Sequence, residues 1–186
     1  MSLLNQWRGI ASDPRSQLWL SLYADALGDE RWDYRIFSCF NLLEGIASEV
    51  LRARQPVTDE AGNPLLQASG RPYTTSQARG KGFELMKLVA GRTNQALQNF
   101  AVGGKTPLRT AWGETAVWVA IRNAVARRGA WETSAGSKPS ACDQQLEAEI
   151  RSLGHDGSFL SGAAASQQAI RTAVESALHA ALHGKL

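Results

Sequence analysis

A run of basic residues in the middle of the chain has the composition of a phosphate-binding site. It reads Arg122-Asn123-Ala124-Val125-Ala126-Arg127-Arg128-Gly129. Arginine presents a planar fork of N–H donors that can bind two oxygens of a phosphate group at once. On a helix, Asn123 and Arg127 share one face because they are four residues apart, and Arg122 lies about 100° around the axis from Asn123. These residue types at this spacing indicate a ligand that carries phosphate.

The charge distribution along the chain favours the same class of ligand. Residues 79–138 carry 10 basic and 3 acidic side chains, a net charge of +7, whereas residues 1–78 and 139–186 each have a net charge of −2. A basic segment between acidic flanks suits a polyanion such as RNA. The structural alternative is that these are solvated helix faces, with Arg127 and Arg128 in a last helical turn, where cations favour the helix dipole.

The N-terminal third of the chain shows the apolar spacing of two helices. Ser12-Asp13-Pro14 is a favourable helix start, and apolar side chains follow at helical spacing as far as Gly28: Leu18, Leu22, Tyr23 and Ala26. A second helix is predicted over residues 33–53. Its apolar residues recur every three or four positions and predict a buried stripe: Ile36, Phe40, Leu43, Ile46 and Val50.

Residues 55–75 interrupt the helical pattern. Turn-forming residues are concentrated at 55–64 and 69–72, and Leu65-Leu66 is a short apolar piece between them. Such a stretch could make a small β-hairpin or an ordered loop. We see no internal repeat in the chain. The segment is expected to be an irregular or hairpin insertion between helices, where related domains would differ in length.

Helical spacing returns after Thr75. A long third helix is predicted up to Phe100 and is expected to end at Gly103-Gly104. A fourth helix is predicted over about residues 109–128, with Gly129 where a glycine commonly follows a helix. Its apolar face is expected to contain Trp112, Ala116, Val119, Ala120 and Ala124.

The last third of the chain is expected to contain a connector and two more helices. Residues 132–140 have the composition of a flexible connector. Helices are predicted at about 142–153 and 163–183, the latter with a regular apolar face: Ile170, Val174, Leu178 and Leu182. The predicted fold is an all-α bundle of five to six helices with one irregular insertion.

Length and composition are those of one ordinary globular domain. The chain has 186 residues, of which 44% are hydrophobic and 20% charged, so we expect a single domain over residues 1–186. No run approaches the roughly 18 apolar residues of a membrane span, and no apolar signal-peptide core is present at the start. Cys39 and Cys142 are too few for a disulfide framework and are interpreted as reduced thiols. We expect a soluble cytoplasmic protein with no membrane partner.

The basic motif, together with Phe40-Asn41-Leu42-Leu43-Glu44-Gly45 in the second helix, resembles the HEPN superfamily (higher eukaryotes and prokaryotes nucleotide-binding domains). Its members are helical bundles, and many are metal-independent RNases. The family motif is an arginine, often followed by a polar residue such as asparagine, with a histidine four to six residues beyond the arginine. Arg122 and Asn123 match the first part, and Arg127 stands where the histidine is expected. The resemblance covers about residues 14–131 as an architecture and about eight residues as a motif.

The resemblance implies an RNA- or nucleotide-binding domain and, if the chain is an enzyme, a metal-independent endoribonuclease. Arg122 would bind phosphate, Asn123 would orient the substrate or Arg122, and Arg127 would add positive charge. Arg128 and Glu44 would support them, with Glu44 as the candidate partner of Arg122. Cleavage by 2′-hydroxyl attack needs a proton acceptor, and arginine cannot serve because it stays protonated at neutral pH. Since general acid–base catalysis contributes about 10²–10⁴-fold in rate, we expect a weak or inactive RNase.

The resemblance also implies a homodimer, because HEPN domains place the motif against a dimer partner. Two copies of Arg122 and Arg127 near one cleft would repel each other unless an anion lay between them. The alternative is a non-enzymatic dimeric interaction module that binds a toxin, an antitoxin or a nucleotidyltransferase-like protein. An apolar, self-complementary surface without an open basic cleft would favour this alternative.

No cofactor and no metal site are expected. His179 and His183 have the i, i+4 spacing that can place two imidazoles on one metal ion, but no neighbouring residues complete a ligand set. Gly80-Lys81-Gly82 is too short for a phosphate loop and lacks a preceding strand. The basic motif is therefore the candidate site.

Overall fold

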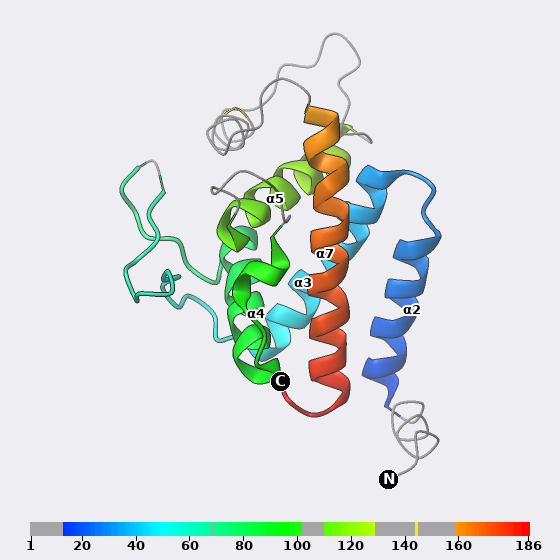
Figure 1. Cartoon of the computed structure of the whole chain (residues 1–186), viewed down its shortest axis with the longest axis horizontal. Coiled ribbons are helices and arrows are strands. Elements are labelled where there is room, and N and C mark those ends of the chain that lie inside the picture. The colour runs from blue at the N-terminus through cyan, green and yellow to red at the C-terminus, as the bar shows by residue number, and fades with distance from the viewer. Residues whose placement is uncertain (1–12, 68, 102–109, 129–143, 145–158) are drawn as a thin grey trace.

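The structure, a computed structural model, describes residues 13–67, 69–101, 110–128, 144 and 159–186. This part contains five α-helices and one 3₁₀-helix: α2 (Pro14–Gly28), α3 (Trp32–Val50), α4 (Ala78–Thr93), η1 (Leu97–Phe100), α5 (Ala111–Arg128) and α7 (Phe159–Leu182). Between α3 and α4, the described residues of the insertion form isolated β-bridges and no strand. The prediction of an all-α bundle with one irregular insertion is confirmed (Figure 1).

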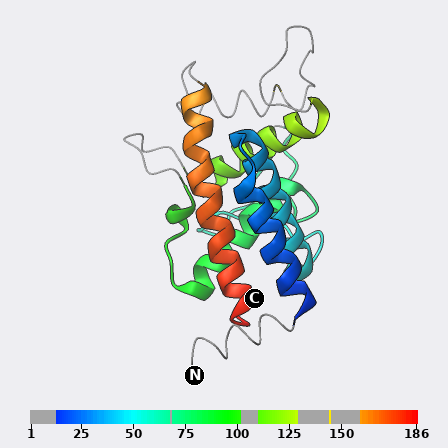
Figure 2. The ribbon, with the colours of Figure 1, turned by 90° about the vertical axis from the view of Figure 1, so that its right-hand side faces the viewer.

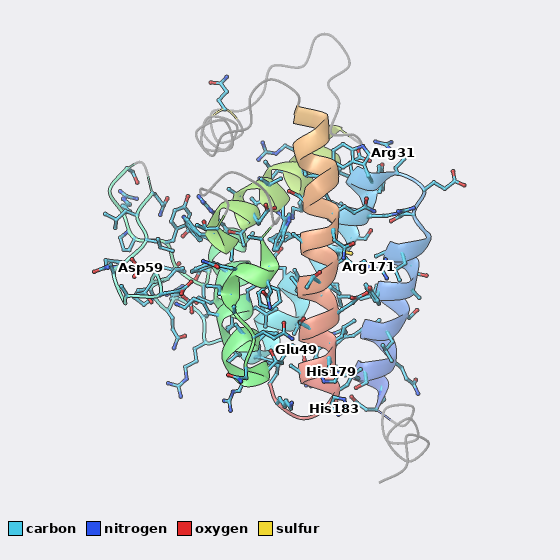
Figure 3. All side chains as sticks on the ribbon, viewed as in Figure 1. Arg31, Glu49, Asp59, Arg171, His179 and His183 are labelled. Carbon is cyan, nitrogen blue, oxygen red and sulfur yellow. The ribbon has the colours of Figure 1, made fainter. Side chains whose placement is uncertain are left out.

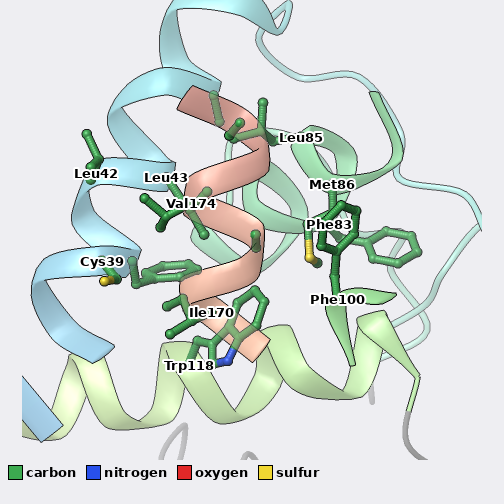
Figure 4. Packing of buried hydrophobic residues seen from close by; sticks show 14 of the residues in the cluster. Cys39, Leu42, Leu43, Phe83, Leu85, Met86, Phe100, Trp118, Ile170 and Val174 are labelled. Carbon is green, nitrogen blue, oxygen red and sulfur yellow. The ribbon is translucent and has the colours of Figure 1, made fainter. Parts of the chain in front are cut away.

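Helix α3 is the central element of the bundle. It packs against α2, α4, α5 and α7, and α7 runs beside α2 in both views of the ribbon (Figures 1 and 2). The predicted stripe of α3 is buried, with Val50 partly so: Ile36, Phe40, Leu43, Ile46 and Val50. Figure 4 shows how Ile170 of α7 lies next to Trp118 of α5 within this core. Burial of this stripe by four helices explains why α3 fixes the positions of the others.

The buried face of helix α2 is not the one that the spacing of its leucines indicates, which contains Leu18 and Leu22. The Asp13 carboxylate caps the helix by accepting hydrogen bonds from the N–H groups of Arg15 (3.3 Å) and Ser16 (3.0 Å). Trp19 is buried, whereas Leu18 and Leu22 are 56% and 43% exposed. Tryptophan buries more apolar surface than leucine. The face that contains Trp19 therefore packs inward, and the neighbouring leucine face is left on the surface.

The predicted third helix is too long. Helix α4 ends at Thr93, and Asn94 adopts the left-handed conformation with φ 54° and ψ 41°. Asparagine takes this conformation more readily than most residues and commonly ends helices. Leu97 and Phe100 then form the ends of η1, in which Phe100 is fully buried. Their spacing of three residues fits a 3₁₀ turn as well as an α-helix, which is why the pattern does not show the break.

The insertion contains an eight-residue repeat, so the prediction of no internal repeat is wrong. Proline recurs every eight residues and an apolar residue follows each time: Pro56-Val57, Pro64-Leu65 and Pro72-Tyr73. The backbones of these apolar residues form a closed ring of hydrogen bonds. Val57 N–H donates to Tyr73 O (2.9 Å), Tyr73 N–H to Leu65 O (2.8 Å) and Leu65 N–H to Val57 O (2.9 Å). Three repeats are needed to close this ring.

The insertion is fixed to one face of α4. A Cβ atom on Gly80 would lie 2.3 Å from the carbonyl oxygen of Thr74, so only glycine fits there. Further along the same helix, Glu84 accepts a hydrogen bond from Thr58 N–H (3.3 Å) and Lys87 Nζ donates to Thr58 O (2.7 Å). Val57 is fully buried. The insertion therefore contributes Val57 and Tyr73 to the packed core.

Several predicted features lie outside the described residues. They are Gly103-Gly104, Gly129, the connector at 132–140, Cys142 and, apart from Gln144, the helix at 142–153. Cys39 is a buried free thiol. None of the helices in the described ranges combines the length and the apolar character that crossing a bilayer requires.

Candidate functional site

Glu44 is the centre of a group of polar side chains that joins three helices. Its Oε2 accepts a hydrogen bond from Arg122 Nη2 of α5 at 3.0 Å, and its Oε1 lies 3.5 Å from Lys81 Nζ of α4. Arg122 Nη1 also donates to Asn123 Oδ1 (3.2 Å), and Lys81 Nζ donates to Ser48 Oγ (3.0 Å). We refer to Glu44, Ser48, Lys81, Arg122 and Asn123 as the polar cluster.

The polar cluster is half-buried and carries a net positive charge. The side chains of Arg122, Lys81 and Glu44 are 31%, 24% and 21% exposed. Two cations surround one carboxylate, so the formal charge of the group is +1. A guanidinium has five N–H donors, and the bonds of Arg122 to Asn123 and Glu44 use two of them. Arg122 can therefore bind an anion while it keeps its ion pair.

Two glycines bring Lys81 to the polar cluster. The Gly80-Lys81-Gly82 segment lies inside α4, where Gly80 packs against the insertion and a Cβ on Gly82 would be 3.1 Å from Phe40 Cε2 of α3. Both glycines let α4 approach its neighbours closely. Sequence reasoning dismisses this segment as a phosphate loop and misses Lys81 and Ser48. The sequence feature that could have indicated Lys81 is a lysine between two glycines within a helical pattern.

The structure brings together three of the five predicted site residues. Arg122, Asn123 and Glu44 belong to the polar cluster, and the expected contact between Arg122 and Glu44 is confirmed. Arg127 is exposed and lies one turn beyond Asn123 on α5. Arg128 is the last residue of α5, and its side chain lies outside the described part of the structure.

A second arginine, Arg79, is enclosed two residues before Lys81. It is 6% exposed, and its guanidinium lies 3.7 Å from the centroid of the Trp112 ring. Its Nη2 donates to Trp112 O and its Nη1 to Tyr73 Oη, both at 3.2 Å. Phe83 meets Trp112 edge-on, with ring centroids 5.2 Å apart. Arg79 thus ties the insertion to the start of α5.

A pocket of about 440 Å³ lies between the insertion, α4, η1 and the start of α5. Its apolar lining includes Leu65, Phe83, Leu97 and Trp112, and the charged lining residues within the described part of the chain are Asp59 and Glu60. Asp59 lies on the insertion, on the opposite side of the bundle from α2 (Figure 3). Sequence reasoning does not identify this pocket, because its walls come from four segments that are distant in the sequence.

The histidine pair lies at the C-terminal end of α7 (Figure 3). The ring centroids of His179 and His183 are 4.3 Å apart. Partial burial lowers the pKa of His179, and the charge of His183 lowers it further. Within the described ranges, no three His, Cys, Asp or Glu side chains are grouped so that they could hold a metal ion.

The polar cluster and the pocket are separate sites on α5. Trp112 and Arg122 are ten residues apart on this helix, which corresponds to about 15 Å along the axis. The polar cluster can bind an anion, whereas the pocket offers aromatic and aliphatic walls beside two carboxylates. No family model, curated protein or solved structure matches this chain.

Proposed function

We propose that this chain is a HEPN-like domain that binds RNA or a nucleotide through the polar cluster. The observation that supports this most is the state of Arg122, which is 31% exposed while Glu44 and Asn123 fix its guanidinium. A guanidinium fixed in this way loses little conformational freedom when it binds a phosphate. Lys81, on the other oxygen of Glu44, adds a second positive charge at the same place.

The domain is further proposed to be a weak or inactive metal-independent RNase. Cleavage by 2′-hydroxyl attack needs a group that accepts a proton near neutral pH, and histidine is the usual choice. Arg127 stands at the position of the family's histidine. Of the two histidines in the described ranges, His179 lies in the last turn of α7 and His183 lies directly after this helix, and both are outside the polar cluster.

The proposal is tested by RNA binding and cleavage in the presence of a metal chelator. Binding of labelled single-stranded RNA is measured by fluorescence anisotropy at several salt concentrations for the parent, Arg122→Ala and Arg127→His. Arg71→Ala is the charge-matched control, because Arg71 is exposed on the insertion and outside the polar cluster. Arg122→Ala should weaken binding about tenfold and reduce the salt slope by about 0.7. Arg71→Ala should stay within about twofold of the parent.

Cleavage of the same RNA separates the remaining interpretations. Little or no cleavage by the parent, with activity gained in Arg127→His, would support a silenced RNase. Cleavage by the parent that Arg122→Ala abolishes would show an active enzyme and contradict the weak-or-inactive part of the proposal. Equal binding by Arg122→Ala and Arg71→Ala would remove the polar cluster as the RNA site.

The second candidate function is a dimeric interaction module, and the exposed leucines of α2 favour it. Leu18 and Leu22 are four residues apart, on neighbouring turns, and are 56% and 43% exposed. Exposed apolar side chains that are adjacent to one another are typical of protein interfaces. Size-exclusion chromatography with light scattering tests this for the parent and a Leu18→Gln/Leu22→Gln variant. A dimeric parent and a monomeric variant would support a module that pairs through α2, whereas a monomeric parent at tens of micromolar would contradict a homodimer.

A further inference from the structure

The pocket beside the insertion has the size and lining of a small-molecule site. Its volume of about 440 Å³ lies within the range of about 300–1,000 Å³ that is usual for ligand pockets. Two aromatic side chains, Phe83 and Trp112, and two leucines, Leu65 and Leu97, supply apolar contact area. The hydrogen bonds of Arg79 to Trp112 O and to Tyr73 hold the Trp112 wall and the insertion in fixed positions. Two of the four segments that line the pocket are therefore tied to each other through Arg79.

The charged groups of the lining select for positive charge. Asp59 and Glu60 are both carboxylates, and no basic side chain lines the pocket among the described residues. The Asp59 carboxylate is held by its own turn, because it accepts hydrogen bonds from the N–H groups of Ala61 (2.9 Å) and Asn63 (2.8 Å) and from Asn63 Nδ2 (3.1 Å). These bonds, above all those from Asn63, lower the pKa of Asp59, so its carboxylate is charged at neutral pH.

Two cations lie near the aromatic wall, and neither lines the pocket among the described residues. The Arg79 guanidinium is 3.7 Å from the centroid of the Trp112 ring and donates to Trp112 O and Tyr73 Oη. Lys87 Nζ lies 5.6 Å from the centroid of the Phe83 ring, but it is paired with Glu84 Oε1 at 2.8 Å and donates to Thr58 O at 2.7 Å. The basic polar cluster is about 15 Å away along α5. Arg79 already stacks on Trp112, so the preference for a cationic ligand rests on the carboxylates of Asp59 and Glu60, which attract positive charge.

We propose that this pocket binds a small organic cation, a primary amine carried on an aromatic or branched aliphatic body. The apolar body would lie against Phe83, Trp112 and the leucines, and the ammonium would lie beside Asp59 and Glu60. This ligand has the opposite charge to the phosphate ligand of the polar cluster. The pocket is thus a second binding site, independent of the proposed RNA site.

Three probes of one shape and different charge test this inference: phenethylamine, 2-phenylethanol and phenylacetate. Binding is followed by the indole N–H resonance of Trp112 in ¹H–¹⁵N spectra of the full chain, assigned with Trp112→Phe. Phenethylamine should shift this resonance with a dissociation constant at least about tenfold lower than that of phenylacetate, since tenfold corresponds to one favourable charge contact in a partly solvated site. The neutral alcohol should fall between them.

Two variants separate the roles of charge and shape. Asp59→Asn/Glu60→Gln should reduce the preference for the amine over the carboxylate to about twofold or less and leave the affinity for the alcohol unchanged. Ala61→Trp, at an exposed position of the lining, should block all three probes. Glu30→Gln, an exposed carboxylate at the α2–α3 turn, is the control and should bind like the parent. Glu60→Gln alone provides the charge test if the double variant is unfolded.

Three results would overturn the inference. The first is no shift of the Trp112 resonance at about 10 mM phenethylamine, a concentration above the expected dissociation constant of so small a ligand. The second is equal affinity of the parent for the amine and the carboxylate. The third is unchanged binding of the amine by Ala61→Trp.

Discussion

Arg79 and Arg122 have the same charge and nearly opposite surroundings. Arg79 is 6% exposed, stacked on Trp112 and bonded to a backbone carbonyl and a tyrosine hydroxyl. Arg122 is 31% exposed and is held by Glu44 and Asn123. The Arg79 guanidinium connects the insertion to the bundle. The Arg122 guanidinium lies at the surface and has N–H donors beyond those that bind Glu44 and Asn123. Exposure and the type of partner, and not charge alone, decide which arginine can meet a ligand.

The same difference separates stability from binding. Groups around Arg79 contribute chiefly to the free energy of unfolding, because they are enclosed by side chains that must separate when the chain unfolds. Partly exposed ion pairs such as Arg122–Glu44 contribute little to stability, because water screens them in both states. Variants in the two regions should therefore change different measured quantities.

Loss of the Arg79 side chain should have the largest effect on stability. Arg79→Ala removes a stacked cation, worth about 2 kcal/mol when desolvated, and hydrogen bonds from a charged group, worth about 1.5–3 kcal/mol each. Because such terms are not additive, we expect the free energy of unfolding to fall by about 3 kcal/mol in urea titrations. The exposed control Arg71→Ala should change it by less than about 0.5 kcal/mol. If Arg79→Ala changed the free energy of unfolding as little as the control does, Arg79 would contribute no more to stability than an exposed arginine, and the contrast with Arg122 would be wrong.

Two glycines of α4 give a matched test of how tightly the insertion packs. Gly80→Ala places a Cβ 2.3 Å from Thr74 O and should destabilise the protein by about 1–3 kcal/mol. Gly91→Ala, in the same helix with no atom within 4 Å of the added Cβ, should stabilise it by about 0.5–1 kcal/mol. Thermal unfolding shows whether the melting temperature falls in Gly80→Ala and rises in Gly91→Ala, as expected.

Removal of the carboxylate at the polar cluster should affect binding more than stability. Glu44→Gln keeps the shape of the side chain and removes the negative charge between Arg122 and Lys81. The free energy of unfolding should fall by about 1 kcal/mol or less, whereas affinity for single-stranded RNA should rise about threefold because the local positive charge increases. A fall in affinity would mean that Glu44 matters mainly by orienting Arg122.

The loss of stability at high pH should depend on neither Arg79 nor Arg122 and their surroundings. Burial raises the pKa of Tyr23 from 10.0 to about 12, helped by its hydrogen bond to Glu175, and burial raises the pKa of Cys39 from 9.0 to about 12. Both groups stay protonated in the folded chain at a pH where the unfolded chain has released the proton. Their contribution is therefore complete below the unfolded pKa values and is lost as the pH rises towards 12. Tyr23→Phe should show a smaller loss of stability than the parent between pH 8 and pH 10.5, by urea titration at each pH.

The fold was predictable to the extent that one face of each helix is apolar. The stripe of α3 and the start of α2 at Asp13-Pro14 follow directly from spacing and capping. The end of α4 does not, because Leu97 and Phe100 keep a helical spacing across a break made by one left-handed asparagine. The buried face of α2 was also obscured, since the packing of Trp19 against other helices decides it.

The residues of the candidate site were predictable only where they are close in the sequence or belong to a motif that resembles the HEPN superfamily. Arg122 and Asn123 are adjacent, and Glu44 follows from the resemblance. Lys81 comes from a third helix, and its position depends on the close approach of Gly82 to Phe40. The pocket is a product of tertiary packing, so no local pattern marks it. The repeat of the insertion was readable as proline every eight residues.

The closed ring of backbone hydrogen bonds makes the insertion a natural scaffold for displaying foreign peptides. Val57, Leu65 and Tyr73 hold the ring against the bundle, whereas the turn at Ser69-Gly70 is exposed and has a glycine at φ 76°. Exposed turn tips tolerate added sequence, and the entropy of closing a longer loop grows slowly with its length. An epitope inserted between Ser69 and Gly70 would be presented at a fixed position without disturbing the lining of the pocket.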